Sequence, residues 1–322
     1  MVSTLCCFIP DIPHPILYPY GDKGGGKSTL SKVMRSIVDP SLTQTLAMPT
    51  KQEELIQLFS HNYVAPFDNI DKVNGWQSDA ICRAVTGEGS SKRRLFTDDD
   101  DFIYSFRRVI ILNGINLSAT RPDFLDRCIS LELERIPKSA RMSEEDFWRA
   151  FEEDKPLILG GIMDAISRAL AILPGVKLDE LPRMADFATC GYAIADALGI
   201  GGERFLEAYY RSIGKQNDLA IESHPVAQVV AVFMEGRPEW TGRPTELLDD
   251  LERVAKDQRV NMDSKLWPKA SNALARRLNE VKSNLLDAGI EYESTRQGNG
   301  RQIKLTAKDA SIYDDEPDEE LT

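Results

Sequence analysis

The chain has 322 residues, enough for two or three domains that each bury a core of their own. Its hydrophobic fraction of 42% and charged fraction of 28% are ordinary for a soluble globular protein. No apolar run approaches the ~20 residues that span a bilayer, and five cysteines without C-x-x-C spacing exclude the usual disulfide and zinc frameworks. The composition therefore predicts a cytoplasmic protein with reduced cysteines and no membrane partner.

The net charge of −12 argues against nucleic acid as a partner for the surface as a whole. The acids are unevenly spread, however: residues 314–320 hold six of them and residues 98–101 hold four. Residues 264–305 carry eight Lys and Arg against four Asp and Glu. A local basic patch can bind phosphates in an acidic chain, whereas residues 306–322 are expected to form an acidic disordered tail.

Short apolar runs alternate with helical segments in the first part of the chain. Strands are predicted at residues 15–20, 62–70, 107–114 and 127–133, and helices at residues 27–38, 52–60 and 78–85. Alternation of this kind is typical of a mostly parallel sheet covered by helices. We therefore expect an α/β core over residues 1–137.

From Ser143 onward the pattern becomes helical. Ser143 followed by Asp146 is typical of a helix start, and helical periodicity continues to about residue 213. This predicts a helical subdomain over residues 138–213, followed by a linker at residues 214–224.

The last ordered part, residues 225–305, predicts three helices and two short strands. The helices are expected at residues 225–235, 243–256 and 270–288, and the strands at residues 290–296 and 301–306 around the turn Gln-Gly-Asn-Gly. Three helices that close on a β-hairpin are typical of a winged helix-turn-helix domain.

The stretch GDKGGGKS, residues 21–28, matches the pattern G-x-x-x-x-G-K-[ST] between a predicted strand and a predicted helix. Glycines let the backbone wrap a phosphate closely, and the helix adds the positive end of its dipole. In such a P-loop Lys27 would bind the β- and γ-phosphates and Ser28 would ligate Mg²⁺. The alternative is a glycine-rich surface turn. The residues predicted to bind ATP and Mg²⁺ are Gly21, Asp22, Lys23, Gly24, Gly25, Gly26, Lys27, Ser28 and Thr29.

Asp68 follows an apolar strand about forty residues after Lys27, where a P-loop enzyme needs an acid to orient the metal. The alternative is an ordinary strand-end aspartate that caps a turn. Many such ATPases place a glutamate next, but this chain has Asn69. Either Asn69 positions the attacking water less directly, or an acid from elsewhere serves, such as Asp71 or Glu53.

Asn113 ends the apolar strand VIILN and is followed by Gly114. A polar side chain there can donate a hydrogen bond to the γ-phosphate or to the attacking water, as sensor-1 residues do. A turn-forming asparagine before glycine is the alternative reading.

Arg127, and with less support Arg121, lies where ring-forming ATPases present an arginine finger to the neighbouring subunit. Such an arginine stabilises the charge that spreads over the transferred phosphoryl group. The alternative for Arg127 is an intramolecular salt bridge with Asp123 or Asp126.

Two basic segments are candidates for contact with nucleic acid. Lys92, Arg93 and Arg94 lie in a predicted mobile loop or hairpin, where they could hold a nucleic-acid backbone or form a solvated charged turn. In the last part of the chain the candidates are Lys269, Arg276 and Arg277 on or before the third helix, and Arg296 and Arg301 beside the turn. A winged helix used only for subunit packing is the alternative there.

The stretches GDKGGGKST, HNYVAPFDNI, RRVIILNGIN and RPDFLDRCISLEL stand in a characteristic order. In this the chain resembles the ATPase modules of phage- and plasmid-type primase-helicases, in the superfamily 3 branch of AAA+ proteins. The resemblance implies an ATP-driven hexameric helicase on single-stranded or forked DNA, which replicates a phage, plasmid or integrated mobile element with a primase-polymerase domain or protein. The alternative is an AAA+ ATPase that loads proteins at an origin, or an ATP-regulated initiator that binds DNA without unwinding it.

Overall fold

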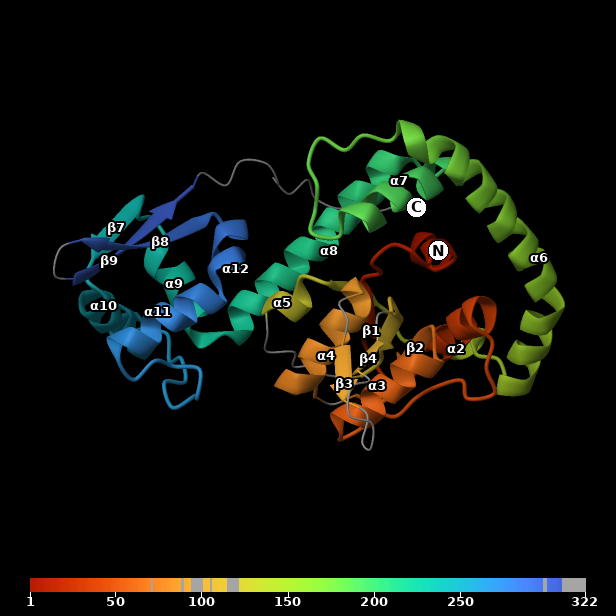
Figure 1. The fold of residues 1–322 in the computed structure, drawn as a ribbon, viewed down its shortest axis with the longest axis horizontal. Helices are drawn as coiled ribbons and strands as arrows, with labels where there is room; N and C mark the ends of the chain where they lie inside the picture. The colour runs from red at the N-terminus through yellow and green to blue at the C-terminus, as the bar shows by residue number, and fades with distance from the viewer. Residues whose placement is uncertain are drawn as a thin grey trace. The chain divides into compact units, whose positions relative to one another are not determined.

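The computed structural model describes residues 1–70, 72–87, 90–93, 101–104, 106–114, 122–297 and 300–308. The chain divides into two compact units, Met1–Gln216 and Asn217–Thr322. Each unit has its own sheet and its own helices, labelled in Figure 1.

The first unit is built on a four-stranded parallel sheet, which confirms the predicted parallel architecture. Its strands, in the order β2-β5-β1-β6, are β1 (Ile16–Tyr20), β2 (Val64–Phe67), β5 (Val109–Leu112) and β6 (Cys128–Glu132). Every residue of β2 and β5 is buried. Because successive side chains of a strand point to opposite faces, both faces of the sheet are covered at its centre.

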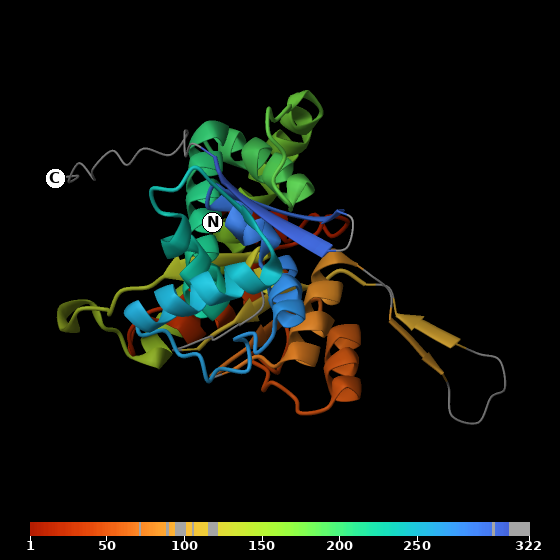
Figure 2. The same ribbon diagram turned by 90° about the vertical axis from the view of Figure 1, so that its left-hand side faces the viewer.

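Five helices and a hairpin accompany this sheet. They are α1 (Val2–Cys6), α2 (Lys27–Val38), α3 (Gln52–His61), α4 (Gly75–Thr86), α5 (Pro122–Leu125), and the antiparallel strands β3 (Ser90–Arg93) and β4 (Asp101–Tyr104). The expected helices and strands are all present, with ends that shift by up to three residues, whereas α1 and α5 were not predicted. Figure 2 shows β3 and β4 standing away from the parallel sheet.

Three long helices follow the sheet: α6 (Glu144–Ile172), α7 (Ala185–Ala197) and α8 (Gly202–Ser223), with short 3₁₀ turns at η1 (Lys138–Ala140) and η2 (Leu173–Gly175). The predicted helix start is confirmed, because the backbone N–H of Asp146 donates to Ser143 Oγ at 3.1 Å. Residues 214–224, predicted as a linker, contain the boundary between the two units at Gln216 and Asn217, but most of the segment is helical. Helix α8 continues through it to Ser223, since no proline interrupts the helix before Pro225.

Helix α6 also corrects the expectation that no segment is apolar enough to cross a membrane. Residues Glu144–Gly175 contain one stretch that could do so by length and composition alone, and 17% of that stretch is buried. Asp164 and Arg168 interrupt the apolar run, which is why its length is not obvious in the sequence.

The second unit contains α9 (Pro225–Met234), β7 (Glu239–Gly242), α10 (Pro244–Asp257), α11 (Ser271–Glu280), α12 (Lys282–Asp287), β8 (Ile290–Gln297) and β9 (Gly300–Ala307). The strands form an antiparallel sheet in the order β7-β9-β8, packed on a core that includes Leu247, Leu251, Leu274 and Leu305.

Three predictions for this unit need correction. The single helix expected at residues 270–288 is two helices, because the backbone of Val281 (φ −112°, ψ 11°) leaves the α-helical region. Strand β7 was not predicted. The second hairpin strand runs to Ala307, so the first two residues of the expected acidic tail belong to the sheet, and residues 309–322 lie outside the described part of the chain.

Candidate functional site

Three polar side chains meet where neighbouring parallel strands end. Ser28 lies in the first turn of α2 after β1, Asp68 directly follows β2, and Asn113 directly follows β5. Ser28 Oγ donates to Asp68 Oδ1 at 3.2 Å, and Asn113 Nδ2 donates to Ser28 Oγ at 3.0 Å and to Asp68 Oδ1 at 2.6 Å. The strand order explains the meeting, since β5 lies between β1 and β2.

Asn113 is fixed in place by its backbone as well as by its amide. Its N–H donates to the carbonyl of Phe67 at 2.9 Å, and its carbonyl accepts from the N–H of Ile70 at 2.8 Å. The residue is only 3% exposed. A Cβ at the next position, Gly114, would lie 2.0 Å from the carbonyl oxygen of Ile70, so only glycine lets these two backbone segments approach so closely.

The glycine-rich loop, Gly21–Gly26, joins β1 to α2 in a conformation that needs its glycines. Gly21, Gly24 and Gly26 have φ values of 122°, 89° and 80°, which side chains with a Cβ rarely adopt. Lys27 Nζ donates to the carbonyls of Gly21 and Asp22, both at 2.7 Å. The predicted loop residues therefore surround one ammonium group at the start of a twelve-residue helix, which is a favourable place for an anion.

The loop also rests on the segment that follows β6, a contact that the sequence pattern did not indicate. A Cβ on Gly21 would lie 2.3 Å from the carbonyl oxygen of Leu133. The N–H of Ile136 donates to the carbonyl of Gly24 at 3.2 Å, and the side chain of Arg135 runs beside Gly24. Because more than a hundred residues separate these segments, only the sheet order could have indicated that they meet.

The oxygens available here suit Mg²⁺ better than a metal with a full protein cage. Among the described residues no group of three or more His, Cys, Asp or Glu side chains could hold a metal ion. Mg²⁺ usually takes one or two protein oxygens and completes its shell with water and phosphate. Ser28 Oγ and Asp68 Oδ1, 3.2 Å apart, match that donor set.

Of the candidates that could replace the second acid, Asn69 reaches this cluster through its backbone. Asn69 is exposed, has a φ of 58° and donates its backbone N–H to Asp68 Oδ1 at 2.9 Å. Glu53 lies in the first turn of α3. Asp71 and Arg121 both lie outside the described residues, so the roles predicted for them stay predictions.

Arg127 forms an intramolecular salt bridge, which is the alternative given above for this residue. Its Nη1 lies 2.6 Å from Asp123 Oδ1, and its side chain is 11% exposed. Arg183, before α7, pairs with Asp123 as well and with Asp126 at 3.0 Å. Burial alone would lower the pKa of Arg127, but the bond to Asp123 raises it above its ordinary value. The sequence reasoning missed Arg183, which has no recognisable motif.

For Lys92 and Arg93 of the β3–β4 hairpin, the structure describes the backbone pairing. Lys92 and Arg93 lie in β3, paired in register with Phe102 and Asp101 of β4. The predicted hairpin is therefore present, and Arg94 lies outside the described residues.

The basic residues of the second unit fall into two groups. Arg276 is 70% exposed on α11, and Lys269 is exposed just before that helix. Arg277 is only 16% exposed, with bonds to Glu280 at 2.7 Å and to the carbonyl of Lys265 at 2.9 Å. Arg277 is therefore held within the fold, while the others face solvent.

The hairpin and helix α11 of the second unit also expose polar side chains. Arg296 and Arg301 are exposed and face each other in register across β8 and β9. Asn272 and Asn279 are exposed on α11 in line with Arg276, a helical row at intervals of three and four residues that the sequence reasoning missed.

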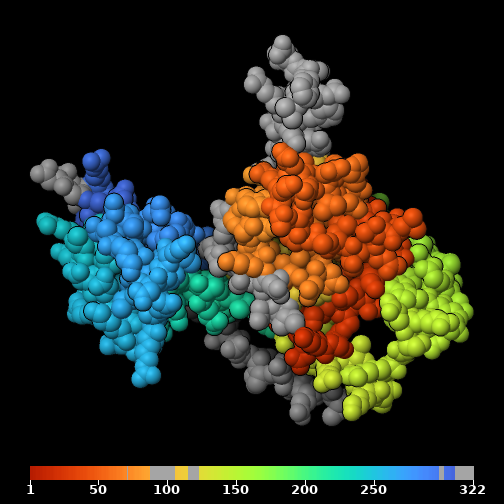
Figure 3. Space-filling model, turned by 90° about the horizontal axis from the view of Figure 1, so that it is seen from below, coloured from red at the N-terminus to blue at the C-terminus, as the bar shows by residue number. Residues whose placement is uncertain are grey.

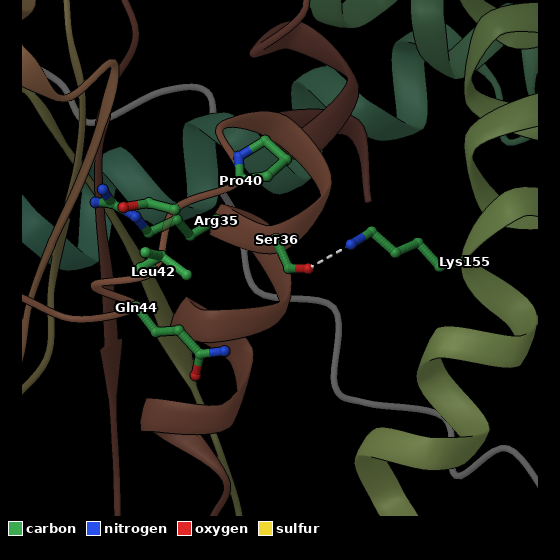
Figure 4. Close-up of a pocket in the computed structure, with 7 residues that line it drawn as sticks. Arg35, Ser36, Pro40, Leu42, Gln44 and Lys155 are labelled. Atoms are coloured by element: carbon green, nitrogen blue, oxygen red, sulfur yellow. Dashed lines mark hydrogen bonds between the residues drawn. The ribbon is translucent and has the colours of Figure 1, made fainter.

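A hollow of about 360 Å³ lies at the other end of α2, away from the glycine-rich loop. It is lined by Arg35, Ser36, Pro40, Ser41, Leu42, Gln44 and Lys155 (Figure 4). Lys155 Nζ donates to Ser36 Oγ at 2.8 Å. Arg35 is buried and donates to the carbonyl of Val64 at 2.6 Å, so its guanidinium supports the fold.

Two family models match the chain. The model described as actinomycete integrative conjugative element replication protein matches residues 1–219, and the model of the AICE RepA C-terminal domain matches residues 226–317. The chain belongs to the actinomycete integrative conjugative element replication protein family. This membership confirms a role in replication and selects the integrated element among the expected phage, plasmid and integrated types.

Other comparisons add little to what the AICE RepA family shows. No curated protein matches the chain. Among solved structures, the apo form of the NrS-1 C-terminal region matches with 11% identity and a TM-score of 0.34, over 95% of this chain and 70% of that one. A likeness at that level carries no argument about the site.

Proposed function

We propose that this replication protein is a Mg²⁺-dependent ATPase that works as a helicase or translocase on the DNA of its conjugative element. The observation that supports the proposal best is the meeting of Ser28, Asp68 and Asn113 beside Lys27 and the glycine-rich loop. Few other chemistries need a glycine-wrapped lysine, a hydroxyl, a carboxylate and an amide at one edge of a parallel sheet.

Each residue has a distinct role in this proposal. The backbone N–H groups of the loop and of the first turn of α2 bind phosphate oxygens. Lys27 exchanges the carbonyls of Gly21 and Asp22 for the β- and γ-phosphates. Ser28 and Asp68 hold Mg²⁺, which neutralises charge on the phosphates when bound.

In this proposal the Asn113 amide donates a hydrogen bond at the position where negative charge develops in the transition state. This amide is buried and already aimed at Ser28 and Asp68, so little reorganisation is needed when it turns to a γ-phosphate oxygen or to the attacking water. Preorganised donors of this kind contribute strongly to transition-state stabilisation.

The second unit is proposed to bind the DNA. Its order of helix, strand, three helices and hairpin is compatible with a winged helix-turn-helix domain, in which α11 would be the helix that enters the major groove. The exposed row of Lys269, Asn272 and Arg276 offers ammonium, amide and guanidinium groups to phosphates and base edges.

The test measures ATP hydrolysis with and without single-stranded and forked DNA, and strand displacement on the fork. The wild-type chain should hydrolyse ATP only with Mg²⁺, faster with DNA, and should separate the fork. Lys27→Ala should abolish hydrolysis while the protein remains folded by circular dichroism. Absence of any nucleotide binding by the folded wild-type chain contradicts the proposal.

A second function has specific support: an ATP-regulated initiator that binds DNA and hydrolyses ATP slowly. Asn69 stands where many ATPases have a glutamate, and Arg127 is engaged by Asp123. Tight ATP binding with slow hydrolysis that DNA does not accelerate, and no strand displacement, favours this function over the helicase.

A further inference from the structure

Three apolar side chains near the middle of helix α6 are exposed to solvent. Leu157, Ile158 and Met163 are 78%, 38% and 47% exposed. A Cβ built on Gly160 or Gly161 would meet no atom within 4 Å. Apolar side chains on the outer face of a helix are ordinarily covered by protein or by a membrane, so this stretch is a candidate contact surface.

Both ends of α6 are held by the same unit, while the stretch between them is open. Near its first half, Lys155 bonds to Ser36 of α2. In its second half Ile162, Ala165 and Ile166 are buried, where α6 packs on α7. Figure 3 shows open space between the surface of α6 and the N-terminal segment. The open stretch is therefore available to another molecule.

A bilayer and DNA are both poor occupants. Because both ends of α6 pack on one folded unit, the whole helix cannot cross a membrane. Glu152, Glu153 and Asp154 are exposed and are separated from the apolar stretch by Lys155 and Pro156. These three acids repel anionic headgroups and phosphates alike. A protein surface that is apolar and basic fits better.

The chain carries such a surface itself. All eight residues of 135–142 are exposed, among them the apolar Ile136 and Met142. Arg135, Lys138 and Arg141 form no ion pair with any described residue. We call residues 135–142 the basic strip.

The opposite surface has the matching character. Glu153 and Asp154 also form no ion pair within the described part of the chain, and the exposed apolar residues Leu157, Ile158 and Met163 follow them. We call residues 153–163 the acidic strip. The two strips thus have opposite unmatched charges, each beside exposed apolar side chains.

We propose that the acidic strip of one copy of this chain binds the basic strip of the next copy. Because the two strips are different surfaces, the contact is head-to-tail, and repetition builds a ring or a filament rather than a closed two-fold dimer. The contact needs no nucleotide, so it stands or fails independently of the proposed ATPase.

Charge reversal tests this contact directly. The double variants Glu153→Lys/Asp154→Lys and Lys138→Glu/Arg141→Glu should each weaken self-association by about tenfold or more in sedimentation velocity at low salt. A mixture of the two variants should assemble again, because each reversed strip then meets a complementary one. The matched control Glu207→Lys/Asp249→Lys changes exposed acids elsewhere and should assemble like the wild type.

The apolar part is tested with Leu157→Gln/Met163→Gln against Leu181→Gln, which changes a 69% exposed leucine outside both strips. Only the first variant should lose assembly. A wild-type chain that stays monomeric at its highest soluble concentration overturns the proposal. So does assembly that the strip variants leave unchanged, or a mixture of the reversed variants that does not assemble.

Discussion

Asn113 donates a hydrogen bond of 2.6 Å to Asp68, although 45 residues separate them in the chain. The bond joins the ends of two adjacent strands, and Asp68 Oδ1 also accepts from Ser28 Oγ. A carboxylate oxygen that accepts from several donors is held in one orientation. In the proposed ATPase, this pair would present one oxygen to Mg²⁺ and one amide to a phosphate.

Asn113→Ala should lower the kcat for ATP hydrolysis by about 10²- to 10³-fold, the usual effect of removing a transition-state donor. The affinity for an ATP analogue should change little, because the glycine-rich loop and Lys27 stay intact. Steady-state kinetics and fluorescence titration measure the two quantities. Gln57→Ala, which removes an exposed amide on α3, should behave like the wild type. Equal losses of kcat and affinity would contradict a role confined to the chemical step.

Gly114→Ala should destabilise the first unit. Its Cβ would lie 2.0 Å from the backbone oxygen of Ile70, so strands β2 and β5 must move apart, which we expect to lower the free energy of unfolding by about 1–3 kcal/mol.

Gly214→Ala is the matched control for that glycine change. It adds a methyl group inside α8 where nothing lies within 4 Å, and it should raise the free energy of unfolding by about 0.5–1 kcal/mol. Urea denaturation followed by circular dichroism measures both. Two variants of equal stability would contradict the close approach at Gly114.

Arg127→Ala should reduce stability more than it reduces hydrolysis. Removing a largely buried arginine leaves Arg183 as the remaining cation paired with Asp123 among the described residues. We expect a loss of about 1–2 kcal/mol in the free energy of unfolding. The midpoint of thermal unfolding and the DNA-stimulated ATPase rate per folded molecule give the two readouts. A variant that unfolds like the wild type but has lost that stimulated rate would instead favour the arginine-finger role.

Much of the site could be predicted because its chemistry is local. The glycine-rich loop, Asp68 and Asn113 each follow an apolar strand, and the carboxyl ends of parallel strands meet at one edge of a sheet. The pattern therefore predicts the cluster without knowledge of the contacts.

What could not be predicted depends on distant partners. Asp123 and Arg183 are sixty residues apart, so the ion pair between them follows only from the fold. The contact of Gly21 with Leu133 needs the position of β6 beside β1. Helix α8 likewise continues through a polar segment that reads as a linker, since polarity alone does not end a helix.

Burial of His14 predicts a loss of stability in mild acid. Its side chain is 2% exposed, and burial, with a smaller contribution from Arg107, lowers its pKa to about 4. The unfolded chain therefore binds the proton more readily between pH 6.5 and pH 4, so stability falls as the pH drops through that window, by at most about 3 kcal/mol. Above pH 6.5 the ring is neutral in both states and contributes no slope.

Urea denaturation across pH 4–7 measures this contribution as the difference between the wild type and His14→Gln. The variant should show a shallower decline toward acid. His61→Gln changes an exposed histidine at the end of α3 and should keep the wild-type slope. Parallel curves for the wild type and His14→Gln would contradict the assignment.

Arg276 and Arg277 are neighbours, but substitution of Arg276 is expected to weaken DNA binding and substitution of Arg277 to lower stability. Arg276 is 70% exposed and lies 3.7 Å from Glu280, whereas Arg277 is 16% exposed and bonds to Glu280 at 2.7 Å. If α11 contacts DNA, Arg276→Ala should weaken duplex binding about tenfold and reduce the salt dependence by about one phosphate contact.

Arg277→Ala should instead lower the thermal stability of the second unit, because the bonds to Glu280 and Lys265 are lost. Lys256→Ala on α10 removes an exposed cation away from α11 and controls for net charge. Fluorescence anisotropy with labelled duplex DNA at several salt concentrations, in the full-length chain, measures affinity and salt slope together. If Lys256→Ala and Arg276→Ala weaken binding equally, the attraction is general charge and α11 is not the contact surface.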